Sequence, residues 1–168
     1  MEQVSITTLT AMQWREYRDL RLRALEESPD AFATTWAQAR AYPDEEWAAR
    51  LQRVSPDVDL PLIARVGDRP AGLLWCRIES PGDAVAHLYQ MWVAPECRGG
   101  GIGRTLMNRA LEWARSAGVR TVVLGVTAGD RPARRLYESA GFLPAGELES
   151  LRPGSDLMVQ TMQCRLTP

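Results

Sequence analysis

The sequence predicts an α/β fold in which helices flank a central mixed sheet. Three observations predict it: segments with the apolar period of helices, β-rich runs separated by turn signals, and an apolar, β-branched run typical of a strand buried on both faces. The 168 residues are enough for one domain with a sizeable core. We therefore expect a single domain over residues 1–168.

The first part of the chain is expected to be helical. Residues 12–27 carry apolar side chains close to a helical period, and Thr10 is placed to cap their start. The sequence SPDAF over 28–32 breaks this helix. A second helix is expected over 44–53, where Pro43 precedes an acidic first turn.

Three strands are expected next. Residues 60–66 and 71–78 are β-rich, and the turn sequence GDRP over 67–70 separates them as in a hairpin. The sequence SPGD over 80–83 marks another turn, and residues 85–93 form the third strand.

The second half is expected to alternate helices with strands. A glycine-rich loop leads into an amphipathic helix that Gly118 ends. The expected elements are a helix over 102–116, a strand over 121–126, a short helix over 131–140, and strands over 145–151 and 157–166.

Composition argues against several classes of protein. There are 20 basic and 21 acidic residues and no basic run, which argues against a nucleic-acid partner. No apolar run approaches the ~18 residues of a membrane span, and the first ten residues lack the features of a signal peptide. Cys76, Cys97 and Cys164 are too few and too widely spaced for a disulfide framework or a zinc site, so a reducing cytoplasm is the expected location.

The sequence RGGGIGRT over 98–105 joins the third strand to the helix at Ile102. A helix N-terminus presents unpaired N–H groups, and glycines let an anion approach them, so this geometry is typical of a phosphate site. The spacing matches neither G-x-G-x-x-G, which would need glycine at Arg104 or Leu106, nor a P-loop, which needs a lysine. A flexible glycine turn without a ligand is the alternative.

Two motifs together resemble the GNAT superfamily of N-acetyltransferases. The loop reads Arg-x-x-Gly-x-Gly after MWVAPE (91–96), as in that family's acetyl-CoA loop. The later sequence DRPARRLYESAGF (130–142) resembles the family form Asn-x-x-Ala-x-x-Leu-Tyr-x-x-x-Gly-Phe. Asp130 departs from this form, because Asp accepts a hydrogen bond but has no amide hydrogen to donate. The matching positions are Ala133, Leu136, Tyr137, Gly141 and Phe142.

The resemblance implies a mostly antiparallel sheet in which strand 85–93 splays from strand 121–126 at a bulge near 91–93. It implies that acetyl-CoA is the co-substrate, with no metal, and that pantetheine enters the gap. Residues 60–145 would bind acetyl-CoA, 1–55 would shape the acceptor pocket, and 146–168 would add strands. The expected cofactor-binding residues are Met91, Trp92, Val93, Arg98, Gly99, Gly100, Gly101, Ile102, Gly103, Arg104, Thr105, Asp130 and Ala133.

Tyr137 fits the family tyrosine that faces the sulfur of the thioester. A phenol of pKa near 10 is protonated at pH 7 and can act as a general acid for the leaving thiolate. The alternative is a tyrosine that only packs on its short helix.

His87 is the one histidine and the first candidate for the base that deprotonates the amine. Strand periodicity predicts that His87, Tyr89, Met91 and Val93 share one face. A purely structural histidine is the alternative, and the base would then be a water held by Tyr89 or by a carboxylate. The candidate carboxylates are Glu26, Glu27 and Glu46.

The resemblance therefore predicts an N-acetyltransferase that acts on a primary amine by direct attack on the thioester. The expected acceptor is a small-molecule or peptide amine, with neither nucleic acid nor membrane as partner, and a homodimer is compatible with the sequence. The alternative is a module that binds acetyl-CoA without turnover, as a sensor or regulator.

Overall fold

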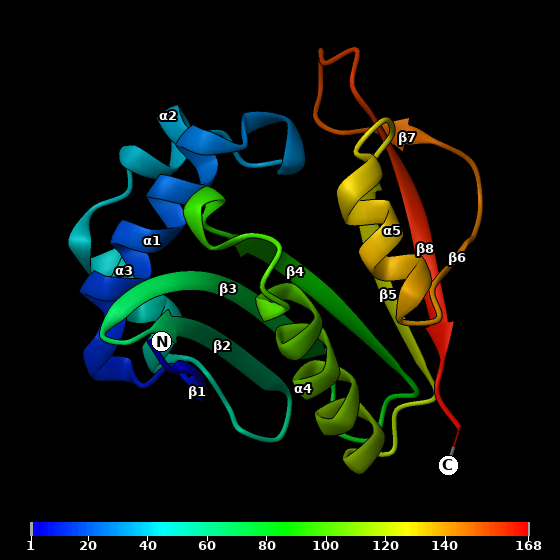
Figure 1. The fold of residues 1–168 in the computed structure, drawn as a ribbon, viewed down its shortest axis with the longest axis horizontal. Helices are drawn as coiled ribbons and strands as arrows, with labels where there is room; N and C mark the ends of the chain where they lie inside the picture. Colours follow the sequence, from blue (N-terminus) through cyan, green and yellow to red (C-terminus); the bar gives the residue numbers. More distant parts are fainter. Residues whose placement is uncertain (1, 168) are drawn as a thin grey trace.

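The computed structural model describes residues 2–167, and their strands form one eight-stranded sheet (Figure 1). The order across it is β1-β2-β3-β4-β5-β8-β6, with β7 paired to β8. The strands are β1 (Val4–Thr8), β2 (Asp59–Val66), β3 (Arg69–Ile78), β4 (Val85–Val93), β5 (Thr121–Thr127), β6 (Leu143–Pro144), β7 (Glu149–Ser150) and β8 (Met158–Arg165).

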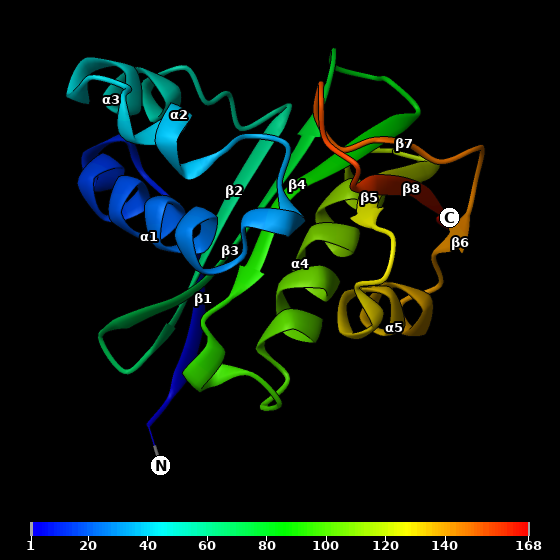
Figure 2. The same cartoon turned by 90° about the horizontal axis from the view of Figure 1, so that it is seen from above.

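Helices cover both faces of this sheet (Figure 2). On one face α4 packs over β2, β3 and β4, and on the other α1 packs over β3 and β4 with α3 beside it. The helices are α1 (Trp14–Glu27), α2 (Trp36–Arg40), α3 (Asp44–Gln52), α4 (Ile102–Ser116) and α5 (Arg131–Ser139), with short 3-10 turns η1 (Ala11–Gln13), η2 (Pro29–Ala31) and η3 (Pro95–Cys97).

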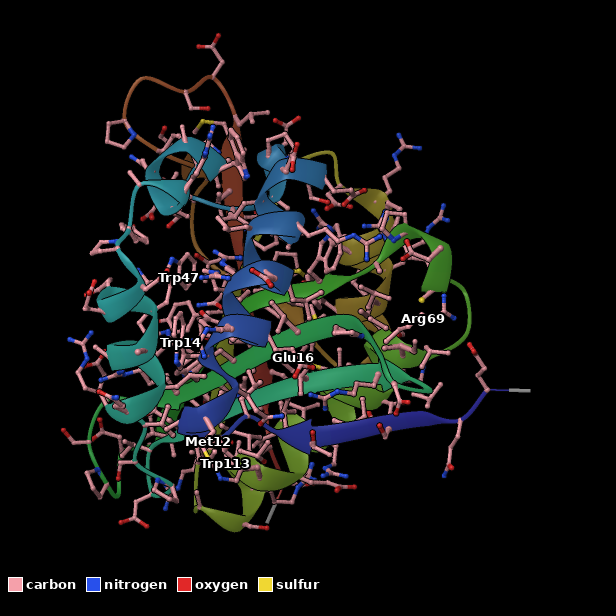
Figure 3. All side chains as sticks on the ribbon, turned by 90° about the vertical axis from the view of Figure 1, so that its left-hand side faces the viewer. Met12, Trp14, Glu16, Trp47, Arg69 and Trp113 are labelled. Carbon is pink, nitrogen blue, oxygen red and sulfur yellow. The ribbon has the colours of Figure 1, made fainter. Side chains whose placement is uncertain are left out.

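The layer formed by α1 and α3 is rich in aromatic residues (Figure 3). Trp47 of α3 meets the Tyr17 ring edge-on, with ring centroids 5.8 Å apart. Both side chains are almost fully buried, so burial of apolar area holds this layer on the sheet. Trp47 is thus a core residue.

The sheet divides between β4 and β5, its one parallel pair among the described strands. Only three residue pairs join these strands, from Val85 with Thr121 to His87 with Val123. Beyond His87 the two strands diverge as Figure 1 shows, and β4 continues to Val93 without a partner on that side. The splayed pair in a mostly antiparallel sheet is confirmed.

A β-bulge in β4 lies beside this divergence. Trp75 of β3 pairs with Tyr89, whereas Leu73 pairs with Trp92, so β4 has one extra residue between the two pairs. Gln90 in the bulge has φ of 61°, the only described non-glycine residue with a positive value. Bulges bend a strand and interrupt its ladder, which is how β4 turns away from β5.

The bulge overturns the prediction that four alternate residues of β4 share a face. Met91 and Val93 pack with the core under α4. His87 and Tyr89 lie on the opposite face, the same one that Gln90 reaches when it accepts a 2.7 Å hydrogen bond from Tyr17 of α1. The extra residue places Tyr89 and Gln90 consecutively on one face and so reverses the alternation.

The other expected elements are confirmed to within a few residues, with three differences. The sequence analysis did not predict β1, a short edge strand, or α2, a helix of five residues. The strand expected over 145–151 is wrong, because Gly146 has φ of 79° and the chain forms only two-residue strands on either side of it. Between residues 2 and 167, no helix combines the length and apolar character needed to cross a membrane.

Candidate active site

A cavity of about 880 Å³ follows the gap between the diverging strands. Its walls come from the end of β4, the glycine loop, the start of α4, the end of β5 and α5, together with residues 27–31 and Leu157. Of the thirteen expected cofactor-binding residues, Gly100 and Thr105 do not line the cavity. The eleven that do are Met91, Trp92, Val93, Arg98, Gly99, Gly101, Ile102, Gly103, Arg104, Asp130 and Ala133.

The N-terminus of α4 opens into this cavity. Gly101 is the N-cap residue with φ of 87°, and no side chain of the described residues caps the helix there. The first N–H bonded within the helix is that of Thr105, to the Gly101 carbonyl at 3.0 Å, and the Thr105 hydroxyl donates to the same oxygen. The N–H groups of 102–104 are therefore available to an anion, favoured by the helix dipole.

Gly103 packs closely against two side chains. A Cβ at this position would lie 3.2 Å from both Met91 Cε and Leu136 Cδ2. A Cβ on Gly100 would meet nothing nearer than the Cys97 carbonyl oxygen at 3.9 Å. The missing side chain of Gly103 thus leaves room at the floor of the cavity, whereas Gly100 has no close neighbour that would favour glycine.

Arg98 is held by α1. Its Nη2 lies 2.9 Å from Glu27 Oε2, and its Nε donates to the Val93 carbonyl at 2.9 Å. Trp92 Nε1 and the Ser28 hydroxyl also donate to the Glu27 carboxylate. Partial burial would raise the pKa of Glu27, but these hydrogen bonds outweigh it and lower that pKa. Sequence reasoning named both Arg98 and Glu27 but missed that they pair.

Asp130 begins α5 as its N-cap residue. The side chain accepts a hydrogen bond from the Ala133 N–H at 3.3 Å. Capping needs an acceptor only, and Asp and Asn serve equally well. This explains how Asp130 can occupy a position where the resembling motif has Asn.

Tyr137 is buried at the junction of two cavities. Its side chain lines the 880 Å³ cavity and also a second one of about 590 Å³. Burial, and to a lesser extent the negative charge of Asp130, raises the pKa of the phenol above its usual value. The hydroxyl forms no hydrogen bond with any of residues 2–167 and stays protonated at neutral pH, so it is free to donate to a bound molecule.

The second cavity lies on the α1 side of the gap. Segments far apart in the sequence form it: α1, the chain after η2, the middle of β4, β5, β7 and β8. Four residues line both cavities, namely Ala31, Met91, Thr127 and Tyr137. A molecule in one cavity can therefore meet a molecule in the other at the point where the sheet divides.

His87 lines the second cavity at the fork of the sheet. It is the last β4 residue that pairs with β5, and its ring stacks on Tyr89 with centroids 6.0 Å apart. Met91 is four residues further along the strand, a distance of roughly 13 Å at the usual rise. At this distance His87 does not reach the junction directly, so any role there requires intervening water.

The segment 29–33 spans the gap above the junction. Thr127 of β5 donates to the Asp30 carbonyl at 2.6 Å. Arg152, from the loop between β7 and β8, donates to the carbonyls of Pro29 at 2.8 Å and Phe32 at 2.7 Å. These bonds tie the two halves of the divided sheet together, and no local sequence signal predicted them.

The fold and site define a class of protein. A sheet divided at a bulge, with an open helix N-terminus at one mouth, is suited to a phosphate-carrying co-substrate. The chain matches the model of the Acetyltransferase (GNAT) family over residues 13–142, and it belongs to that family. Within residues 2–167 no group of three or more His, Cys, Asp or Glu side chains could hold a metal ion.

Relatives and solved structures agree with this assignment. Mycothiol acetyltransferase of Thermobifida fusca (strain YX) is 29% identical over 148 residues, which are 84% of this chain and 44% of that protein. The chain thus spans less than half the length of this relative. A GNAT acetyltransferase of Streptococcus pneumoniae superposes with a TM-score of 0.84 at 19% identity, over 98% of this chain and all of the other. The acetyl-CoA complex of yncA from Salmonella typhimurium has a TM-score of 0.81 at 18% identity, covering 99% and 95%.

Proposed function

We propose that this protein transfers the acetyl group of acetyl-CoA to a primary amine by direct attack of the amine on the thioester. The observation that carries this proposal is Tyr137, a protonated phenol in the wall that two cavities share. Acetyl-CoA occupies the larger cavity and the amine enters from the smaller one.

The larger cavity provides for the pyrophosphate, the pantetheine and the thioester of acetyl-CoA. The pyrophosphate binds the open N-terminus of α4, where Gly103 leaves the floor clear. Pantetheine lies along Met91 and Val93, whose β5-side edge is unpaired beyond the fork, and bonds to the backbone as an added strand does. The Met91 N–H at the bulge is placed to stabilise negative charge on the thioester oxygen.

Tyr137 acts as the general acid. The amine attacks the carbonyl carbon, the tetrahedral intermediate collapses, and the C–S bond breaks. The phenol proton passes to the departing sulfur. Its raised pKa means that the phenol is protonated when the thiolate forms, and the phenolate that remains regains a proton from water.

His87 acts as the base through water. An amine of pKa about 10.4 is neutral in only about one molecule in 2,500 at pH 7, a cost of about 4.6 kcal/mol, so a proton acceptor speeds the reaction. The carboxylates named as alternatives are engaged elsewhere or exposed: Glu27 binds Arg98, and Glu46 pairs with Arg50 at 3.4 Å. His87 lines the amine cavity and has no such partner among residues 2–167.

The test is thiol release from acetyl-CoA in the presence of a broad panel of amines. Release that depends on one or more amines supports the transferase. Tight acetyl-CoA binding with no turnover on any amine would support the non-catalytic sensor instead.

A further inference from the structure

Within residues 2–167, one buried charge in the smaller cavity has no partner. Arg21 lies on the inner face of α1, where the other buried residues are Tyr17, Leu20, Ala24 and Leu25. Its side chain is 6% exposed, and Nη1 is the one buried polar side-chain atom of the described residues without a hydrogen bond. A buried charge is costly unless it is paired, so this arrangement needs an explanation.

Two other arginines of this helix have carboxylate partners. Arg18 binds Asp44 at 3.0 Å, and Arg23 binds Glu96 at 2.7 Å. Arg21 forms no ion pair within residues 2–167, and its contact is with the face of the Phe32 ring, 4.5 Å from the centroid. The nearby Arg50 adds a like charge. No acidic side chain of residues 2–167 therefore neutralises the charge of Arg21.

Arg21 nevertheless stays a cation. Burial, together with the charge of Arg50, lowers the pKa of its guanidinium to about 10, still well above neutral pH. A positive charge is therefore present in the cavity wall under ordinary conditions. The same wall holds one carboxylate, that of the exposed Glu149, and no ion pair joins it to Arg21.

We propose that Arg21 is the carboxylate-binding residue of the acceptor site and that the acceptor is a primary amine carrying a carboxylate, the amino-acid class. This inference rests on the proposed function, because it fills the smaller cavity with the acceptor. The volume of about 590 Å³ is within the range of small-molecule sites. A guanidinium binds a carboxylate through two parallel N–H···O bonds, which fixes the far end of the acceptor while its amine faces Tyr137.

The experiment compares matched acceptors in matched variants. Amino acids with small, aliphatic, aromatic and polar side chains are each assayed beside their carboxamides, at saturating acetyl-CoA. The carboxamide keeps the side chain and loses the charge. Because the two amines differ in basicity, the measured quantity is the ratio of kcat/KM for acid over amide, compared between wild type and variants.

Arg21→Met keeps the length of the side chain and removes the charge. We expect the acid-to-amide ratio to fall at least tenfold in Arg21→Met, mainly through KM, and less in Arg21→Lys, which keeps the charge without the planar fork. Arg15→Met is the control, since Arg15 is exposed on the same helix and stacks on Trp14. Arg21→Met should also melt at a higher temperature, because an unpaired buried charge is lost.

The outcomes separate this inference from the proposed function. An acid-to-amide ratio that is unchanged in Arg21→Met overturns the carboxylate site and leaves the transferase intact. If no amine is acetylated, a melting temperature raised by millimolar amino acid in wild type but not in Arg21→Met supports the site without the activity. Absence of both acetylation and stabilisation overturns both.

Discussion

The two cavities that meet at Tyr137 are built in opposite ways. Most residues that line the larger one come from two stretches, 91–104 and 127–137, with residues 27–31 and Leu157 completing it, and its expected contacts are mostly with backbone. The smaller one gathers side chains from α1, β4, β5, β7 and β8. A co-substrate bound by the backbone requires glycines at fixed spacing, which can be recognised in the sequence. An acceptor bound by side chains from scattered elements produces no such sequence pattern.

Gly103→Val gives the largest expected effect and tests the larger cavity. The new side chain collides with Met91 and Leu136 and fills the cavity floor. We expect acetyl-CoA affinity to fall by about 100-fold or more by calorimetric titration, since close backbone approach is lost. Gly100→Val is the matched control, because a Cβ there has no close neighbour and Gly100 does not line the cavity. Unchanged affinity in a folded Gly103→Val protein would refute the phosphate cradle.

His87→Ala tests the smaller cavity. We expect turnover near neutral pH to fall roughly 10- to 100-fold, with acetyl-CoA affinity nearly unchanged, because the base acts on the amine alone. The acidic limb of the pH–rate profile should disappear with the histidine. If turnover and the acidic limb both match wild type, His87 is a structural residue and another group is the base.

Arg152→Gln tests the link between the two halves. Loss of the bonds to Pro29 and Phe32 loosens the segment over the junction. We expect KM for the amine to rise about 3- to 10-fold with little change in acetyl-CoA affinity. Arg109→Gln is the control, as Arg109 also bonds a remote carbonyl, that of Ile6. Equal effects of the two substitutions would show that the segment has no specific role.

The smallest effect concerns stability at high pH. Burial raises the folded-state pKa of Tyr137 above the value near 10 of an unfolded chain. The contribution of Tyr137 to the free energy of unfolding is complete below pH 10. It declines as pH rises further, by at most about 1.4 kcal/mol per pH unit, because only the unfolded state ionises. Urea unfolding between pH 8 and 11 should show a shallower decline for Tyr137→Phe than for wild type. Parallel curves would contradict the burial of the phenol.

Eleven of the residues that line the larger cavity were named from the sequence as cofactor-binding residues, because their signals are local. The glycines before Ile102 and the motif around Tyr137 each lie within one strand–loop–helix unit. Their spacing along the chain therefore determines where these residues lie in the fold. Helix 102–116 and strand 85–93 were predicted with the bounds that the structure has.

The smaller cavity could not be predicted because its determinants are not local. One extra residue at Gln90 reverses the alternation of β4 and moves His87 to the other face. Arg21 reads in the sequence as one of several arginines on a helix, and only the packing of Phe32 and β4 shows that it is buried without a partner. The pairing of Arg98 with Glu27 likewise joins residues far apart in the chain.

The most direct test of the central claim, that chemistry occurs where the cavities meet, is the single-turnover rate of Tyr137→Phe. The substitution keeps the ring that packs on Phe142 and removes only the proton donor. We expect the rate of acetyl transfer to fall roughly 10- to 1,000-fold, with acetyl-CoA affinity little changed, and measuring a single turnover excludes masking by product release. A well-folded Phe variant with the full single-turnover rate would contradict the account, since Tyr137 would then only pack at the junction.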